Sequence, residues 1–214
     1  MVRDYAPITQ LVTAPVVVVT PGNRPFQKLS DLIAAAKARP GQLRYATYGP
    51  GSAPHLAGEL LASAAGITLE AIPYKGASEA QLALLREEVD LGFETLSATK
   101  AHLPTAKLRV LSLNGEQRSA FIPEAPGMAE QGLAAAAMEA FYCLAAPAGT
   151  PSEITNRLAK EVREILALPD VKEKLASQML EPAAKGPEAM AALVKDQTAK
   201  YKAVAAKAGI SLSS

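Results

Sequence analysis

The feature that most limits how this chain can fold is a regular alternation of strand-like and helix-like segments between residues 15 and 115. The strand-like segments are short and apolar, and the helix-like segments repeat apolar residues every three or four positions. Such alternation predicts β-α-β crossovers and a mainly parallel sheet. The expected strands are Val16–Val19, Leu43–Thr47, Glu70–Pro73, Val89–Phe93 and Leu108–Leu113, and the expected helices are Leu29–Lys37 with Ser30 as N-cap, His55–Ala64, and a helix from Ser78, its N-cap, to Glu88.

The rest of the chain predicts a second unit that has fewer strands. Further strands are expected only near residues 8–12 and 140–145, and beyond Pro147 the sequence is almost wholly helical. Thr150 is the expected N-cap of the first of these helices, with Pro151 at its first position. The overall prediction is an α/β fold: residues 14–115 form a complete lobe, residues 1–13 and 138–214 form the remainder of another, and residues 116–137 connect them. The later helices are expected at Ser152–Leu166, Pro169–Gln178 and Pro187–Lys207.

Composition excludes several classes of protein. Lysine and arginine (22) nearly balance aspartate and glutamate (21), which argues against a nucleic-acid partner. The lone Cys143 excludes an intramolecular disulfide, which fits a reducing compartment or a periplasmic protein. No apolar run approaches the roughly 20 residues of a membrane span, and the chain does not start with a basic-then-apolar signal peptide. We therefore expect either a cytoplasmic chain or one numbered from after a removed targeting segment.

The loop after the second strand of the expected lobe is the strongest candidate for ligand binding. Thr47, Tyr48, Gly49, Gly51 and Ser52 lie between that strand and a helix. Glycines allow the backbone to approach a ligand, hydroxyls donate hydrogen bonds, and a helix start offers free N–H groups and the positive end of its dipole. This pattern predicts a carboxylate cradle, with an ordinary β-α turn as the alternative. Tyr48 could narrow the pocket or stack on a flat ligand.

Two further helix and strand ends extend this candidate site. Ala77 and Ser78 begin the next helix and form a second candidate for anion binding. Glu94 and Thr95 end a strand, at the edge where α/β sheets bind ligands. The alternative role of Glu94 is to cap the following helix. Lys75, in a loop beside a glycine, is expected to be solvated.

Metal binding and catalysis are not expected. His55 and Glu59 lie four residues apart on one helix face but have no third ligand, so His55 is expected to bond a loop carbonyl. The glycine loop has neither the Gly-Lys-Ser/Thr of a nucleotide P-loop nor a Gly-x-Ser-x-Gly elbow. A hydrolase or lyase of carboxylic acids remains a remote alternative. Its only support is Ser52, His55, Lys75 and Glu94, whose spacing matches no catalytic motif. The sequence predicts no cofactor.

Three motifs, in order along the chain, resemble those of one family. The motifs are Gly-x-Gly-Ser-x-x-His-Leu-Ala-Gly-Glu at residues 49–59, Pro-Tyr-Lys-Gly at residues 73–76 and Ala-Pro-Ala-Gly-Thr-Pro at residues 146–151. They are similar to those of the extracytoplasmic solute receptors of tripartite tricarboxylate transporters, the Bug-type or TctC-like receptors. Residues 25–32, 37–41 and 107–109 and Arg118 also fit. The resemblance covers essentially the whole chain.

This resemblance implies a type II periplasmic-binding-protein-like fold, a periplasmic location and a non-enzymatic function. Two lobes would close on a di- or tricarboxylate, an acidic amino acid or an aromatic acid, and deliver it to membrane transporter subunits. Many family members have Asp where this chain has Glu94, in a position to bind an amino group or water. Family members also carry a signal peptide and about a third of the mature protein ahead of the position that matches Tyr5. We therefore expect an incomplete lobe, weak or absent ligand binding by an isolated monomer, and, as an alternative function, dimerisation through that lobe.

Overall fold

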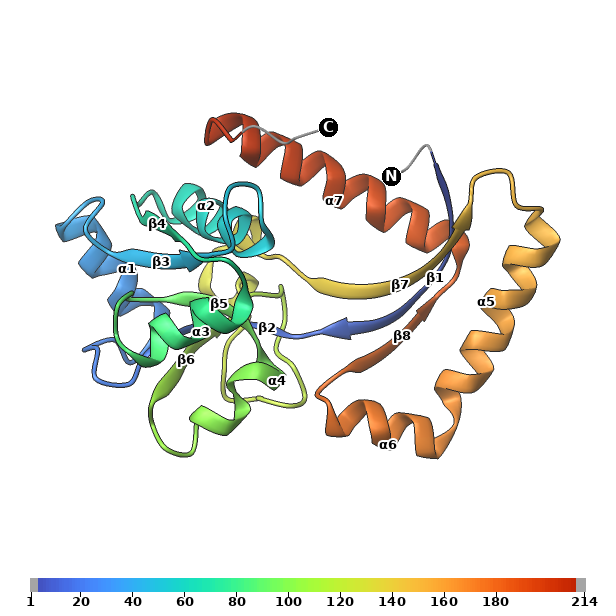
Figure 1. Cartoon of the computed structure of the whole chain (residues 1–214), viewed down its shortest axis with the longest axis horizontal. Coiled ribbons are helices and arrows are strands. Elements are labelled where there is room, and N and C mark those ends of the chain that lie inside the picture. Colours follow the sequence, from blue (N-terminus) through green and yellow to red (C-terminus); the bar gives the residue numbers. More distant parts are fainter. Residues whose placement is uncertain (1–3, 211–214) are drawn as a thin grey trace. The chain divides into compact units, whose positions relative to one another are not determined.

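The protein forms two compact units in a computed structural model that describes residues 4–210 (Figure 1). Unit 1 contains the chain up to Ala14 together with Ala140–Lys202, and unit 2 contains Pro15–Glu139 together with the chain from Ala203 onward. Within residues 4–210, no helix combines the length and the apolar character that crossing a bilayer requires. Each unit has its own sheet, so each is described separately.

The sheet of unit 2 is mainly parallel, with one strand running in the opposite direction. Its central strand β2 pairs antiparallel with β5 on one side and with β6 on the other. Strands β3 and β4 pair in parallel, and a parallel bridge between Tyr45 and Leu91 joins β3 to the segment that enters β5. The strand order is therefore β4-β3-β5-β2-β6. The bounds are Val16–Pro21 (β2), Arg44–Thr47 (β3), Glu70–Pro73 (β4), Gly92–Thr95 (β5) and Leu108–Leu113 (β6).

Helices cover both faces of this sheet. Leu32 of α1 and Leu61 of α2 share one hydrophobic core with Tyr45 and Phe93. On the opposite face, α3 packs against β2, β3 and β5, and the side chain of Leu84 fills the space beside Gly92. Because both faces are covered, β2 is a continuous apolar run instead of an alternating one. The helices are Leu29–Ala38 (α1), Ala53–Ala65 (α2), Ala77–Leu85 (α3) and Leu96–Thr99 (α4), with a 3-10 turn at Lys100–His102.

Residues 116–137, expected as a connector, belong to unit 2 and contribute to its core. Met128 and Ala136 are fully buried in the same hydrophobic core as α1 and α2. The N–H of Met138 donates to the carbonyl of Asn114 at 2.7 Å, which closes this segment back onto the end of β6. Its proline, glycine and alanine content resembled a linker, but its small apolar side chains pack closely. Two 3-10 turns, Ala129–Gln131 and Ala134–Ala136, lie within it.

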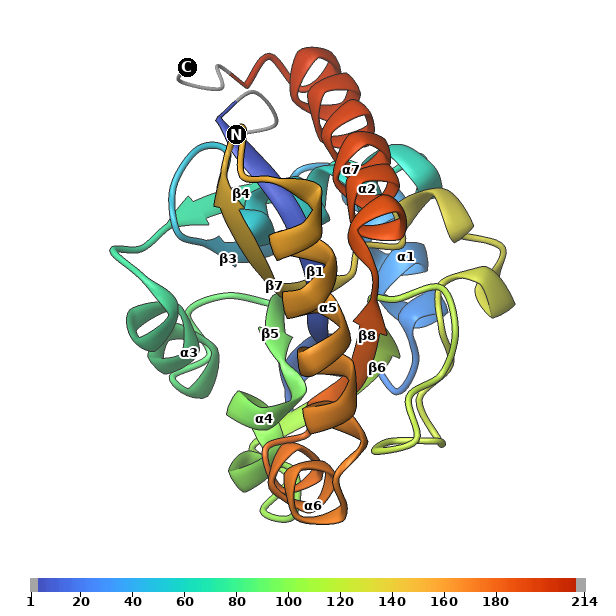
Figure 2. The same cartoon turned by 90° about the vertical axis from the view of Figure 1, so that its right-hand side faces the viewer.

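Unit 1 is built on an antiparallel sheet in the order β7-β1-β8. Helix α5 packs on β1 and β8, and Figure 2 shows it running along this sheet. Strand β8 was not predicted, because its sequence Glu-Pro-Ala-Ala-Lys lacks β-branched residues. Pairing with β1 defines it, and the Thr9 hydroxyl donates to the Lys185 carbonyl at 2.7 Å. The elements are Tyr5–Ala14 (β1), Ala140–Pro147 (β7), Ser152–Ala167 (α5), Pro169–Ser177 (α6) and Glu181–Lys185 (β8). Helix α7 (Pro187–Lys207) belongs to unit 1 up to Lys202 and to unit 2 from Ala203.

Three predicted helix caps are wrong. Lys28, not Ser30, is the N-cap of α1, and the Asp31 carboxylate accepts the Lys28 N–H at 3.1 Å. Gly76, not Ser78, precedes α3, and Glu79 accepts the Lys75 N–H at 3.1 Å. In both helices a carboxylate in the first turn reaches back, a role that a hydroxyl at the cap position would otherwise fill.

The third correction concerns α5. Pro151 is its N-cap, and Ser152 is its first helical residue. The Thr150 hydroxyl donates to the carbonyl of Pro147 at 2.8 Å instead of accepting a helix N–H. The hydroxyl therefore stabilises the turn between β7 and α5 and does not cap the helix.

Candidate functional site

The predicted ligand residues of unit 2 gather at one edge of its sheet. Strands β3 and β5 run in parallel, so their last residues, Thr47 and Thr95, lie at the same edge. Strand β4, which leads to α3, is the parallel neighbour of β3 and ends there too. The starts of α2, α3 and α4 therefore share the edge at which open α/β sheets bind ligands.

The loop between β3 and α2 is held in shape by its own side chains. The Ser52 hydroxyl accepts the Tyr48 N–H at 3.2 Å and donates to the Gly49 carbonyl at 2.7 Å. The Thr47 hydroxyl accepts the Gly49 N–H at 3.3 Å. Gly49 (φ 99°) and Gly51 (φ 75°) adopt a backbone conformation that glycine takes without strain. The loop is thus preorganised, and its hydroxyls are engaged within it.

His55 has a different partner from the predicted one. Its Nδ1 accepts the N–H of Gly51 at 3.1 Å, so the expected bond from the ring to a loop carbonyl is wrong. With the N–H groups of Tyr48, Gly49 and Gly51 already engaged, a ligand would have to use the first turn of α2. There Ala53 and His55 carry N–H groups without an intrahelical acceptor, whereas Pro54 has none.

Glu94 is the most perturbed acidic group of this edge. It is only 4% exposed, and the side chain of Tyr48 lies near its carboxyl. Burial raises the pKa of Glu94 to about 7, although the nearby Tyr48 hydroxyl partly opposes that shift. Burial, together with the neighbouring Glu94, raises the pKa of Tyr48 to about 12. Near neutral pH the pair therefore consists of a neutral phenol and a carboxyl group poised between its acid and its anion.

Thr95 and the start of α3 complete the edge. The Thr95 hydroxyl accepts the Ala98 N–H at 3.4 Å and thereby caps α4, the role that was the alternative for Glu94. Ala77 and Ser78 are exposed in the first turn of α3. Lys75 is exposed beside them. The structure thus brings the predicted residues to one edge, with Glu94 buried and the start of α3 open to solvent.

One hydrogen bond of α2 joins two residues that no sequence pattern connects. The Tyr45 hydroxyl donates to Glu59 at 3.0 Å, and burial strongly raises the pKa of Tyr45. Gly58 is required here, because a Cβ at this position would overlap the Tyr45 ring. Glu59 is therefore a partner of Tyr45, not of His55.

Among residues 4–210, no three His, Cys, Asp or Glu side chains are grouped so as to hold a metal ion.

Two arginines that carry the family resemblance bind backbone and acidic groups. The Arg109 guanidinium donates to the carbonyls of Phe26 at 2.9 Å and of Gly22 and Arg24 at 3.2 Å, which fixes the loop after β2. Arg118 forms an ion pair with Glu130 at 2.9 Å. Both arginines stabilise unit 2 away from the candidate edge.

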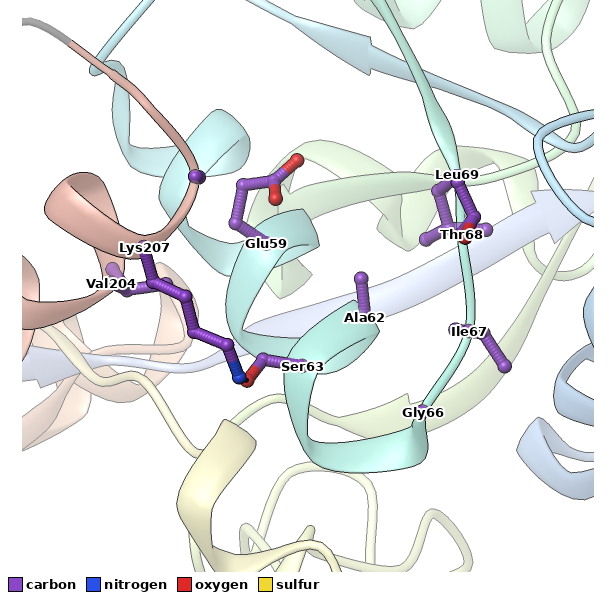
Figure 3. A pocket seen from close by; sticks show the side chains of 10 residues that line it. Glu59, Ala62, Ser63, Gly66, Ile67, Thr68, Leu69, Val204 and Lys207 are labelled. Atoms are coloured by element: carbon purple, nitrogen blue, oxygen red, sulfur yellow. Dashed lines mark hydrogen bonds between the residues drawn. The ribbon is translucent and has the colours of Figure 1, made fainter.

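A cavity of about 380 Å³ lies at the other end of α2 (Figure 3). It is lined by the second half of α2, the segment that follows, and the last turns of α7, which belong to unit 2. Figure 3 shows Lys207 reaching the hydroxyl of Ser63, at 2.8 Å. None of the predicted ligand residues is among the ten that line it.

The fold and the edge define a class of protein. An α/β sheet whose edge presents helix starts, an ordered glycine loop and one buried carboxyl is typical of periplasmic-binding-protein-like domains, which bind small solutes. The family model "Tripartite tricarboxylate transporter family receptor" (TctC) matches residues 1–210, and the chain belongs to this family.

Relatives in sequence agree. A UPF0065 protein from the tcbD-tcbE intergenic region of Pseudomonas sp. is 33% identical over 205 residues, which cover 94% of this chain and 60% of that protein. BugT of Bordetella pertussis is 30% identical over 99% of this chain and 65% of its own length. The chain thus spans less than two thirds of the length of either relative.

Solved structures give the same fold. "R. palustris Rpa4515 with adipate" superposes with a TM-score of 0.83 at 29% identity, covering 97% of this chain and 70% of the other. The periplasmic binding protein BugD superposes with a TM-score of 0.78 at 29% identity, covering 96% of this chain and 70% of BugD.

Proposed function

We propose that this chain supplies the ligand-binding edge of a solute receptor that captures a small carboxylate in the periplasm for a tripartite tricarboxylate transporter. Family membership supports the class of function. The related R. palustris structure is described as the protein with adipate, which supports a carboxylate as the class of ligand. The observation that carries the proposal is the ordered loop 47–52, which leaves the first turn of α2 as its open anion-binding feature.

In this proposal one ligand carboxylate binds at the start of α2. The N–H groups of Ala53 and His55 donate to it, and the positive end of the helix dipole favours its charge. The start of α3, at Ala77 and Ser78, would receive a second carboxylate or a polar group of the same ligand. Glu94 and Thr95 would lie beside the ligand, from the end of β5.

The same arrangement favours binding over catalysis. The Ser52 hydroxyl is hydrogen-bonded to two backbone groups of its own loop, and His55 Nδ1 accepts a backbone N–H. A nucleophile and its base need a hydrogen bond to each other, whereas Ser52 and His55 are each bonded to backbone groups of the loop. We therefore propose that the ligand is released unchanged to the transporter and undergoes no chemical step.

The test is calorimetric titration of the chain with adipate, malate, citrate, glutamate and benzoate. The variant Ala53→Pro removes one N–H that is proposed to donate, while proline suits the first position of a helix. Since a hydrogen bond to a charged group contributes about 1.5–3 kcal/mol, affinity should fall about 10- to 100-fold. Ser152→Pro, the same change at the first position of α5 in unit 1, is the matched control and should bind like the unchanged chain.

Two results would contradict the proposal. One is that none of the five acids binds at millimolar concentration. The other is that Ala53→Pro and the unchanged chain bind an acid equally well.

A further inference from the structure

One edge of the sheet in unit 1 lacks the features that keep sheet edges from pairing. The strand order is β7-β1-β8, and Figure 2 shows β7 and β8 on either side of β1. Among residues 4–210, no strand pairs with the outer side of β7. About half of the backbone N–H and C=O groups of an edge strand point away from its partner, so this side of β7 offers hydrogen-bonding groups to a further strand.

Every other edge strand of the described chain contains a charged residue, but β7 does not. In unit 1, β8 begins with Glu181, ends with Lys185 and contains Pro182. In unit 2, the edge strands β4 and β6 contain Glu70 and Arg109. Strand β7 has the sequence Ala-Phe-Tyr-Cys-Leu-Ala-Ala-Pro, which is eight residues without a charge and with proline only at the end. Because charges and prolines are what natural edge strands use against pairing, β7 is the edge that is open to another strand.

Apolar surface continues from this edge over the faces of β7. Tyr142 is 59% exposed, and Cys143 is exposed as well. Beside the strand lies a cavity of about 280 Å³, lined by residues 143–145 of β7, the start of β1 and the first turns of α7. All of the lining residues belong to unit 1, and none of them carries a charge. A continuous apolar surface of this kind is typical of a site that binds another protein chain.

A second copy of this chain is the partner that fits the edge. Two β7 strands related by a two-fold axis run antiparallel, so each supplies the groups that the other leaves unpaired, and each contact occurs twice. Neither strand has a charge, so their pairing brings no like charges together. Pairing uses the open edge of both copies, while Pro182 and the terminal charges protect β8. Association through this edge therefore stops at two chains.

We propose that the chain forms a two-fold symmetric homodimer in which β7 pairs antiparallel with β7 of the second copy. The two three-stranded sheets of unit 1 then become one continuous sheet. Cys143 is the fourth of the eight residues of β7, so its two copies lie close to the two-fold axis when the strands overlap in full. Dimerisation, expected from the sequence as an alternative function, thereby acquires a defined surface, and it does not require the carboxylate binding proposed for unit 2.

Sedimentation equilibrium of the reduced chain tests the stoichiometry. An interface built on one strand edge is small, and we expect a dissociation constant of about 10 µM. The average mass should then rise from close to that of one chain at about 1 µM to nearly that of two chains at about 200 µM. Tyr142→Lys removes an exposed aromatic side chain and places a charge on the edge. It should weaken the dimer about 100-fold, because the change acts twice.

The matched control is Ile165→Lys, which places the same charge at a half-exposed apolar position of α5 in the same unit. It should dimerise like the unchanged chain. Circular dichroism of both variants establishes that they are folded.

Hydrogen exchange of the unchanged chain is a second measurement that needs no variant. From about 1 µM to about 200 µM, exchange in peptides from β7 should slow about fivefold, since only the monomer leaves this edge open. Peptides from β8 and β4 should exchange at the same rate at both concentrations. Cys143 is the one cysteine of the chain, so a bismaleimide can link two chains only through this residue. A linker of about 8 Å, the separation of diagonal neighbours on paired strands, should give a covalent dimer.

The outcomes distinguish this edge from other surfaces. A dimer that Tyr142→Lys weakens and Ile165→Lys does not, with slower exchange in β7 and a Cys143 cross-link, supports the proposal. A chain that stays monomeric at the highest concentration overturns it. A dimer without slower exchange in β7, or one that only Ile165→Lys weakens, places the interface elsewhere and overturns it too. If Tyr142→Lys does not fold, exchange and cross-linking of the unchanged chain decide. Titration with the five acids is a separate measurement, so failure of the proposed function leaves this result unaffected.

Discussion

At the residue scale, burial gives Glu94 consequences for stability that are independent of any ligand. Its folded-state pKa of about 7 lies above the ordinary 4.5, so the folded chain holds a proton that the unfolded chain has released. Between pH 4.5 and pH 7 the folded state therefore binds more protons, and stability falls as pH rises. Above pH 7 the loss is complete and no longer grows.

This behaviour predicts a pH-dependent gain for Glu94→Gln. The pKa shift corresponds to about 3 kcal/mol of penalty on the folded state above pH 7. Urea unfolding should therefore show the variant gaining about that much over the unchanged chain between pH 4.5 and pH 8, because glutamine pays no ionisation penalty. A difference that stays constant across this range, or an equal change in Glu70→Gln, would refute the assignment.

The residues of the candidate edge show how far sequence reasoning could reach. A strand, a glycine loop and a helix are local features, so Thr47, Gly49, Gly51 and Ser52 were identifiable from their order along the chain. The proximity of Tyr48 and Glu94 joins the loop after β3 to strand β5, and it depends on β3 and β5 being neighbours. No local pattern encodes that adjacency. The bond from Tyr45 to Glu59 was missed for the same reason.

At the element scale, α5 has a wider apolar face than unit 1 covers. Thr155, Ala159 and Leu166 are buried, whereas Ile154 and Ile165 remain about half exposed. All of these lie within one side of the helix, because residues 154 and 165 and residues 155, 159 and 166 project in neighbouring directions. Large exposed aliphatic side chains grouped in this way form the kind of patch that binds apolar molecules.

This face predicts that the chain binds the dye ANS in its folded state. Lysine at two of its positions, in the double variant Ile154→Lys and Ile165→Lys, should reduce ANS fluorescence at least severalfold, because the dye needs contiguous apolar surface. The free energy of unfolding should change by less than about 1 kcal/mol, since both side chains are half exposed. Unchanged fluorescence in the folded double variant would place the apolar patch elsewhere.

Elements differ in how well their sequences predicted them. The helices α5, α6 and α7 have long apolar repeats, and each was predicted within one residue of its bounds. Strand β8 has no such pattern and exists because β1 offers it a pairing edge. Caps were misassigned where an acidic side chain in the first turn, such as Asp31, replaced a hydroxyl at the cap position.

At the scale of the whole molecule, the two units should respond separately to damage. Gly58 lies against Tyr45 in unit 2, and an added methyl group overpacks that core by about 1–3 kcal/mol. Hydrogen exchange of Gly58→Ala should therefore speed up in peptides from β2, β3 and β5. Peptides from β1 and β7 should exchange as before, because they belong to unit 1. Ser30→Ala, at an exposed position of α1 in the same unit, is the control. Equal acceleration in both units would show that they unfold as one.

This division affects the order in which the two units can be completed while the chain is being synthesised. The central strand of unit 1 is β1, but its partners β7 and β8 begin only at Ala140 and Glu181. Residues 15–139, by contrast, are contiguous and supply most of unit 2. During translation unit 2 therefore has nearly all of its residues before the two strands that pair with β1 in this structure have been made. A chaperone that protects the nascent chain therefore has a clear target in β1, which is synthesised long before the two strands that pair with it.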